Sequence, residues 1–330
     1  MTIDYLTHPN FHNFNPFLLP SQQGGGGGIH VKTWFVSEAL SRTHGVRLIT
    51  NTSEIENNVV LIEPLRFRLG VPEYEEDVPA LLKGLTETKA KKILFCTEKT
   101  ILTFSPSLRN SLLSCVDVVT ASCEYQKALM KYIGITPKCI VRDPISDIYL
   151  SPIAFDHKET QLVASGQISW YKNTIQCIEV FKRLAGVIKR VYIGSKGLWA
   201  TDNNDEHSAQ LEDEMASNSD EVIKEVPMHD LARLFFTSRF GLWVAQHDTT
   251  ATAVMGKLMS GMLVTSARHG YATELPVAAV SGVDAQVSTI RDLMSRSDDE
   301  LVARSRSVVD WCRNNVSYTV FHDQLTEALK

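Results

Sequence analysis

Short apolar stretches alternate with amphipathic, helix-like stretches along the chain, and this alternation constrains the fold more than any other feature. The first half contains predicted strands at residues 2–7, 46–50, 59–63, 92–97, 116–122 and 139–141. The second half repeats the pattern, with predicted strands at residues 161–165, 191–193, 221–226, 240–245 and 262–266. Strands joined by helices form parallel sheets that carry helices on both faces. The sequence therefore predicts an α/β fold with two Rossmann-like parallel-sheet domains.

The length of 330 residues also favours two domains, because single hydrophobic cores rarely grow beyond about 250–300 residues. The proline-containing crossing between Pro144 and Lys158 is the predicted boundary, which gives domains of residues 1–150 and 151–330. Residues 288–330 are predicted to be mostly helical, and the last helix is free to pack back on the first domain.

Composition indicates a globular protein of the cytoplasm, or of the host cytoplasm if a phage encodes it. Hydrophobic residues make up 44% of the chain and charged residues 22%, and no run approaches the roughly 20 apolar residues of a membrane span. The six cysteines form no CxxC pair and are expected to be small buried residues. The net charge of −5 gives no general attraction to DNA, although Arg66, Arg68, Lys99 and Arg109 could form a local basic groove.

Five consecutive glycines, Gly24 to Gly28, stand between the first predicted strand and a helix predicted to start at Ile29. Glycine has no Cβ, so the N–H groups of such a loop can approach a bulky anion, and the helix dipole adds positive potential. A flexible linker is the alternative, but linkers usually join domains, whereas this run leads into an amphipathic helix. We therefore interpret the glycine loop as part of a phosphate site.

Five motifs occur in a fixed order, and none of them is specific alone. They are the glycine loop; Asp117 to Ser122 before a helix; Ala164 to Gln167 followed by Lys172-Asn173; a glycine turn at Gly194; and His247 to Thr250 before Met259-Ser260-Gly261. Together they resemble the GT-B glycosyltransferases, most of all the retaining, glycogen-synthase-like enzymes that use nucleotide sugars. The resemblance covers nearly the whole chain. It implies an acceptor-side first domain and a nucleotide-sugar second domain facing a central crevice.

The resemblance also implies a donor site for a nucleoside diphosphate sugar, which is a co-substrate, so no cofactor is expected. Because a diphosphate leaves, the site needs cations, backbone amides or helix N-termini where negative charge grows. The glycine loop would close over the donor. The implied donor-binding residues are Gly26, Gly27, Gly28, Gly166, Gln167, Lys172, Gly194, His247, Thr249, Thr250 and Ala251.

Two positions depart from the family pattern. An arginine usually stands where this chain has Gln167, so Lys172 would act alone or with another cation such as Arg142, Lys196 or Arg268. The family's two glutamates, separated by seven residues, correspond here to Asp248 and Gly256. Asp248 can still hold sugar hydroxyls, whereas Gly256 has no side chain to bind a ribose.

Three residues are candidates for catalysis: Glu98, Lys172 and Asp248. Glu98 follows a buried strand and could orient or deprotonate the acceptor, although a surface ion pair with Lys99 explains it equally well. In the resembled family, attack on the same face of the sugar gives retention, and the leaving phosphate helps to take the acceptor proton. The histidines are scattered and no DxD occurs, so the reaction is expected to be independent of metals.

The sequence leaves three functions open. The resemblance implies a retaining glycosyltransferase, and a similarity in layout to phage enzymes that glucosylate hydroxymethylated DNA bases keeps DNA among the candidate acceptors. A non-catalytic sugar- or nucleotide-binding module is the alternative, motivated by Gln167 and Gly256. An NAD-dependent dehydrogenase rests on the glycine loop alone, and the strand ending at Thr50 lacks the acidic residue that ribose recognition needs.

Overall fold

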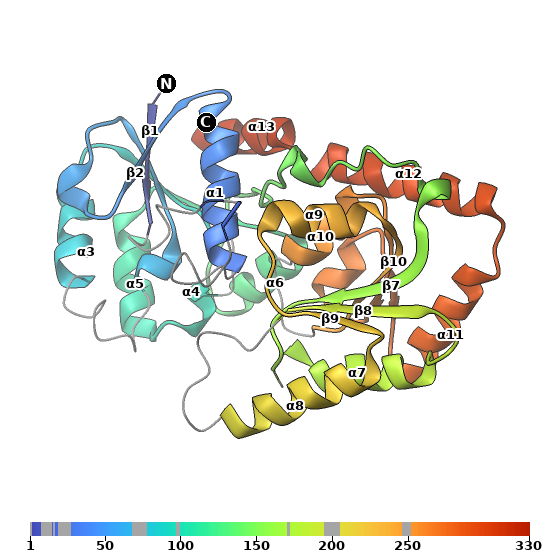
Figure 1. Ribbon diagram of the computed structural model, residues 1–330. Helices are drawn as coiled ribbons and strands as arrows, with labels where there is room; N and C mark the ends of the chain where they lie inside the picture. The colour runs from blue at the N-terminus through green and yellow to red at the C-terminus, as the bar shows by residue number, and fades with distance from the viewer. Residues whose placement is uncertain are drawn as a thin grey trace. The chain divides into compact units, whose positions relative to one another are not determined.

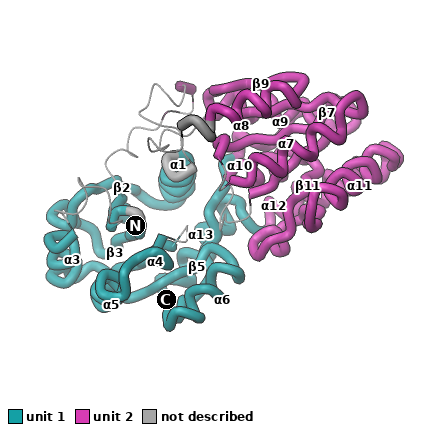
Figure 2. The backbone as a smooth tube through the Cα atoms, turned by 90° about the horizontal axis from the view of Figure 1, so that it is seen from below, with its two compact units in different colours: residues 1–14, 29–146, 315–330 teal, residues 15–28, 147–314 magenta. Residues whose placement is uncertain are grey.

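The protein forms two compact units in a computed structural model that describes residues 2–7, 15, 17–18, 28–67, 78–96, 100–169, 172–194, 205–245 and 252–330 (Figure 1). Unit 1 contains residues 1–14, 29–146 and 315–330, and unit 2 contains residues 15–28 and 147–314 (Figure 2). The chain thus crosses into unit 2 after Ser146 and returns to unit 1 at Asn315.

The described part of unit 1 is built on a six-stranded parallel sheet with the strand order β2-β1-β3-β4-β5-β6. All four residues of β3 are buried, as expected for a strand in a sheet that is covered on both faces. The strands are β1 Thr2–Leu6, β2 Gly45–Ile49, β3 Val59–Ile62, β4 Lys91–Leu94, β5 Val118–Ala121 and β6 Cys139–Ile140.

Alternate residues of β3 pack into two hydrophobic clusters on opposite faces of this sheet. Val59 and Leu61 pack with residues of α1 and α13, whereas Val60 and Ile62 pack with residues of α3, α5 and α6. The C-terminal helix therefore completes the core of unit 1. The helices of this unit are α1 Gly28–Ser41, α3 Val78–Glu87, α4 Thr100–Thr103, α5 Pro106–Cys115, α6 Glu124–Tyr132 and α13 Tyr318–Leu329, with the 3-10 turns η3 Thr52–Glu54 and η4 Pro64–Phe67.

The described part of unit 2 is built on a second six-stranded parallel sheet, with the order β12-β11-β10-β7-β8-β9. Its strands are β7 Glu159–Ser165, β8 Lys189–Ile193, β9 Glu221–Ile223, β10 Ser238–Trp243, β11 Leu263–Ala267 and β12 Ala278–Val280. Its helices are α7 Thr174–Arg183, α8 Asp205–Asn218, α9 Met228–Phe236, α10 Thr252–Met259, α11 Val283–Met294 and α12 Asp298–Asn315, with the 3-10 turns η5 Asp147–Tyr149, η6 Phe155–His157 and η9 Tyr271–Glu274.

Each sheet has a switch point, where successive strands are added on opposite sides of the first one. In unit 1 it lies between β1 and β3, and in unit 2 it lies between β7 and β10. Ligands of open α/β sheets bind outside the carboxyl ends of the strands at such points. The topology therefore directs attention to the residues that follow these four strands.

The predicted fold class is confirmed: both sheets are parallel and the chain ends in helices. Four of the six cysteines are buried, and Cys115 and Cys139 are partly exposed. The predicted elements do not include α4 and β12, which are only four and three residues long and so show too little periodicity in the sequence. No helix in the described part of the chain combines the length and apolar character needed to cross a membrane.

Candidate functional site

Two glycine turns meet at the carboxyl ends of β7 and β8. Gly166 and Gly194 both have φ of +149°, and Gly166 N donates to Ile193 O at 3.0 Å. The Tyr192 hydroxyl donates to Gly166 O at 3.1 Å and fixes that carbonyl from the side. A Cβ on Gly194 would lie 1.9 Å from Gly166 O, so only glycine fits there. The structure thus brings two predicted donor-site residues into direct contact.

The start of α7 lies at the switch point of the same sheet. Asn173, the N-cap residue, has a left-handed φ of 58°, and its Nδ2 donates to Val244 O, just after β10, at 3.4 Å. Thr174 Oγ1 accepts from Ser169 N at 3.0 Å and closes the turn that leads into the helix. These contacts place the start of α7 beside the end of β10, and the half-buried Lys172 directly precedes the N-cap residue. An N-terminus in this position suits a diphosphate.

A polar group with an unused hydrogen-bonding capacity lies at this edge as well. Ser165 Oγ, on the last residue of β7, is buried and has no hydrogen-bond partner in the part of the chain that the structure describes. Gln167 is half-buried two residues later. The arrangement therefore offers a hydroxyl, an amide side chain, a lysine and two glycine turns within one short segment of unit 2.

In unit 1, the residue at the switch point is Glu63, which is not among the predicted site residues. Its backbone N donates to Leu6 O at 3.0 Å, which sets it directly after β3 and beside the end of β1. The side chain is 3% exposed and accepts a hydrogen bond from the Tyr5 hydroxyl at 3.3 Å. Burial, together with the nearby Glu63 carboxylate, raises the pKa of the Cys96 thiol and that of Tyr5 well above their usual ranges.

No protein-family model matches the sequence, and no curated protein matches it. Solved structures do match. HepE from Anabaena, in complex with UDP and glucose, aligns over 100% of this chain and 99% of its own, with a TM-score of 0.70 and 10% identity. An alpha-glucosyltransferase in complex with UDP and a 13-mer DNA containing an HMU base aligns over 100% of both chains, with a TM-score of 0.67 and 13% identity. A trehalose-phosphate synthase from Burkholderia xenovorans aligns over 91% of this chain and 76% of its own, with a TM-score of 0.63 and 13% identity.

The chain has the GT-B fold. Identities of this size show the fold alone, so each site residue has to be judged on its own surroundings. Of the predicted donor-site residues, Gly166, Gln167, Lys172 and Gly194 lie at the carboxyl edge of the unit 2 sheet, and Gly28 is the first residue of α1. The others, together with two of the three catalytic candidates, lie outside the described residues: Gly26, Gly27, Glu98, His247, Asp248, Thr249, Thr250 and Ala251.

Gly256, where the GT-B resemblance places a ribose-binding glutamate, faces an aromatic ring. A Cβ added there would lie 2.9 Å from Cε1 of Tyr149, whose side chain is 2% exposed and stacks on Phe235. Helix α10 therefore packs against η5 and α9 through a glycine, and the ring occupies the space that a larger side chain would need. Because Tyr149 is distant in sequence from Gly256, no sequence pattern links the two.

Lys257, the next residue, was also missed. It is 1% exposed; its Nζ donates to Leu242 O at 3.0 Å and lies 5.8 Å from the centroid of the Phe235 ring. Burial lowers the pKa of Lys257 to about 7. Its position in the apolar run Ala253 to Met259 was the available signal, because a lysine in such a run is either exposed or held by a specific partner.

Arg66 and the motif that ends at Ser122 make internal contacts in the structure. Arg66 is 2% exposed, and its Nε donates to Thr50 O at 3.0 Å, so its guanidinium does not contribute to a basic groove at the surface. In the motif that ends at Ser122, the serine N and Oγ both donate to Gln126 Oε1, at 2.6 and 3.0 Å. The polar groups of this serine are thus engaged by the first turn of α6. The described residues contain no cluster of three or more metal-ligating side chains.

Proposed function

We propose that this protein is a glycosyltransferase that moves a sugar from a nucleoside diphosphate sugar to an acceptor hydroxyl. The observation that supports it best is the alignment over the full length of both chains with HepE in complex with UDP and glucose. The glycine turns at Gly166 and Gly194 and the start of α7 provide backbone groups and a lysine at the edge where such a donor is expected.

In the proposed reaction, the sugar C1–O bond to the diphosphate breaks as a bond to the acceptor oxygen forms on the same face. Negative charge grows on the diphosphate, and the Lys172 ammonium and the amides at the start of α7 stabilise it. The acceptor hydroxyl gives its proton to the departing phosphate oxygen, so configuration is retained without a protein nucleophile. The proposal needs no cofactor or metal, and Glu98 and Asp248 keep their predicted roles in orienting acceptor and sugar.

A hydroxymethylated DNA base is the acceptor that we propose to test first. The supporting observation is the alignment over 100% of both chains with an alpha-glucosyltransferase that was solved with UDP and DNA containing an HMU base. The net charge of −5 predicts weak general binding to the phosphate backbone, so recognition would rest on the flipped base.

The test is an assay of the purified chain with UDP-glucose and other nucleotide sugars, with DNA that carries hydroxymethyl bases or unmodified bases. Mass spectrometry should detect addition of one hexose to the hydroxymethyl DNA only, and the anomeric proton coupling of the product would report retention. Transfer to small saccharides but not to DNA would refute the proposal that DNA is the acceptor, while the proposed glycosyltransferase activity would stand.

A non-catalytic sugar- or nucleotide-binding module is the second candidate, and a specific observation favours it. Gln167 replaces an expected arginine, and the expected ribose carboxylate is replaced by Gly256 against the Tyr149 ring. Saturable nucleotide binding without transfer to any acceptor, and without donor hydrolysis, would favour this function over the enzyme.

A further inference from the structure

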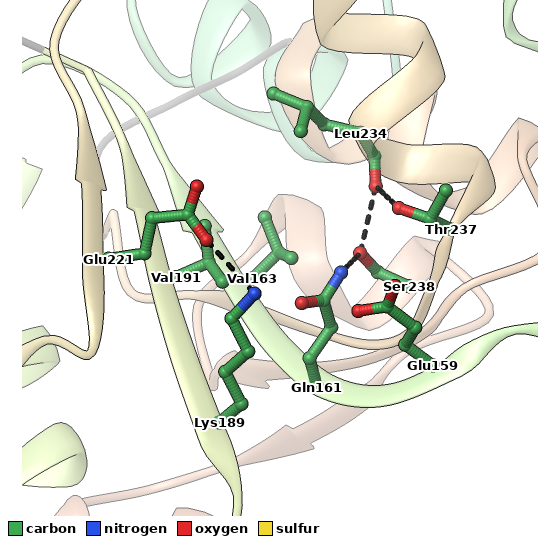
Figure 3. Close-up of a pocket in the computed structure, with 9 residues that line it drawn as sticks. All are labelled: Glu159, Gln161, Val163, Lys189, Val191, Glu221, Leu234, Thr237 and Ser238. Atoms are coloured by element: carbon green, nitrogen blue, oxygen red, sulfur yellow. Dashed lines mark hydrogen bonds and ion pairs between the residues drawn. The ribbon is translucent and has the colours of Figure 1, made fainter.

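A cavity of about 170 Å³ lies at the amino ends of the unit 2 strands, at the edge of the sheet opposite to the donor-site edge (Figure 3). Its volume is more than ten times the roughly 10–15 Å³ that a single water needs. The starts of β7, β8, β9 and β10 form its walls, and Val163, Val191 and Leu234 provide apolar surface. All of these residues belong to unit 2.

One buried hydrogen-bonding atom in this cavity is unused. Gln161 is 5% exposed, and its Nε2 donates to Ser238 Oγ at 2.7 Å. The Ser238 hydroxyl gives its single proton to Leu234 O at 2.8 Å, so it can only accept from Gln161. The amide nitrogen of Gln161 must therefore face Ser238, and Oε1 faces the cavity, as Figure 3 shows. Among the described residues, Oε1 has no partner.

The charged groups around the cavity favour a positively charged occupant. Glu159 and Glu221 contribute two carboxylates and Lys189 one ammonium, so the lining carries a net charge of −1 by formal count. The Lys189 ammonium donates to Glu221 Oε2 at 2.9 Å, and this hydrogen bond is the main reason why the pKa of Lys189 is raised. The groups left for a ligand are thus the Glu159 carboxylate and the Gln161 carbonyl, both acceptors.

We infer that this cavity binds a small primary alkylammonium ion, an aliphatic amine with a single positive charge. The ammonium donates to Gln161 Oε1 and to the Glu159 carboxylate, and the methylene chain lies against Val163, Val191 and Leu234. An inorganic cation is disfavoured, because the described residues contain no cluster of three acidic or imidazole ligands. An anion would meet two carboxylates and no unengaged cation among the lining residues.

The test uses the full chain and butylammonium in isothermal titration calorimetry at low ionic strength, where charge interactions are least screened. Saturable binding of one equivalent is expected. Gln161→Leu removes the buried acceptor and should weaken binding by at least about tenfold, since a hydrogen bond to a charged group is lost. Glu179→Gln is the matched control: it removes a carboxylate on α7 that pairs with Lys182 and does not line the cavity, and affinity should stay unchanged.

A second variant and a second probe guard against misfolding and against general attraction to acidic side chains. Gln161→Glu keeps the side-chain length and adds a negative charge, so it should tighten butylammonium binding several-fold. 1-Butanol has the same chain length without charge and should bind at least about tenfold more weakly. Absence of saturable binding, equal affinity of Gln161→Leu and the unmodified chain, or equal affinity for the alcohol would each overturn the inference.

Discussion

A Cβ atom on Gly194 would lie 1.9 Å from the carbonyl oxygen of Gly166. The two residues follow neighbouring strands, β7 and β8, and each adopts a φ of +149° that side chains rarely allow. Their contact fixes the course of the backbone at the predicted donor-site edge. The amide of Gly166 donates to Ile193 O at 3.0 Å and that of Gly194 donates to Ile223 O at 2.9 Å, so neither turn can move without losing a hydrogen bond. This pair thus constrains the backbone of the candidate site.

Gly194→Ala should destabilise the protein by about 3 kcal/mol or more, because the new methyl group meets backbone and the φ is unfavourable. Urea unfolding measures the change. Gly186→Ala is the control: its φ is +70° and a Cβ there would have nothing within 4 Å, so only the conformational cost of about 1 kcal/mol remains. Equal losses in the two variants would show that the contact with Gly166 is relieved easily.

Lys172→Ala should lower turnover by about a hundredfold with little change in the free energy of unfolding, since the proposed donor site would lose one cation at the leaving diphosphate. Lys182→Ala, on the exposed side of α7, serves as the control because its ion pairs with Glu179 and Glu214 lie at the surface and contribute little. Unchanged turnover of Lys172→Ala would move the donor site away from the start of α7.

Gly256→Ala should cost about 1–3 kcal/mol, since the methyl group would press on the buried Tyr149 ring at 2.9 Å. In a Tyr149→Ala background the same substitution should cost much less, with a coupling energy between the two positions of about 1 kcal/mol or more. A double-mutant cycle in urea measures this coupling. Strict additivity would mean that the ring does not restrict position 256.

Lys257→Met should stabilise the protein near neutral pH and flatten the rise of stability with pH. Burial lowers the pKa of Lys257 from 10.5 to about 7, so between these values the unfolded chain binds a proton that the folded chain does not. The free energy of unfolding therefore rises with pH across this window, by up to about 1.4 kcal/mol per pH unit for one group.

Unfolding free energies of Lys257→Met measured from pH 6 to pH 10, roughly the window over which its charge differs, check this expectation. In Lys257→Met, the free energy of unfolding should still rise somewhat with pH because of Lys158, which is also buried and whose pKa is lowered to about 8. Lys83→Met, at an exposed position on α3, should leave the slope unchanged. A parallel shift of the whole curve without a change in slope would show that Lys257 is charged in the folded state.

Asp220→Asn should lower the free energy of unfolding at pH values above the ordinary carboxyl pKa. It should also remove part of the loss of stability that occurs as the pH falls. Hydrogen bonds from Arg190 lower the pKa of Asp220 from 3.8 to about 2, so its contribution is present above 3.8 and is lost as the pH falls through about 2. The Asp220 side chain is 41% exposed, so solvent screening limits the cost to about 1 kcal/mol. Thermal unfolding measured between these pH values tests this prediction. If the loss of stability at low pH is the same in Asp220→Asn as in the unmodified chain, the Arg190–Asp220 pair does not cause it.

Much of the fold was predictable because both sheets are parallel and buried. Strands such as β3 then appear as continuous apolar runs, and helices such as α9 show a clear apolar face. The glycine turns at Gly166 and Gly194 were also predictable, since each glycine directly follows a predicted strand, at residues 161–165 and 191–193. These features are local, and local spacing in the sequence records them.

The partners of individual site residues depend on residues that are far apart in the chain. Glu63 was not selected, because its burial against Tyr5 and its place at the switch point follow from the order of β1 and β3. The Tyr149 ring against Gly256 and the Leu242 carbonyl that holds Lys257 are likewise tertiary contacts. The sequence alone determined the strand and helix pattern and the glycine positions. Only the tertiary structure decided which polar groups are buried together, because burial depends on distant segments that cover a side chain, and no local spacing encodes them.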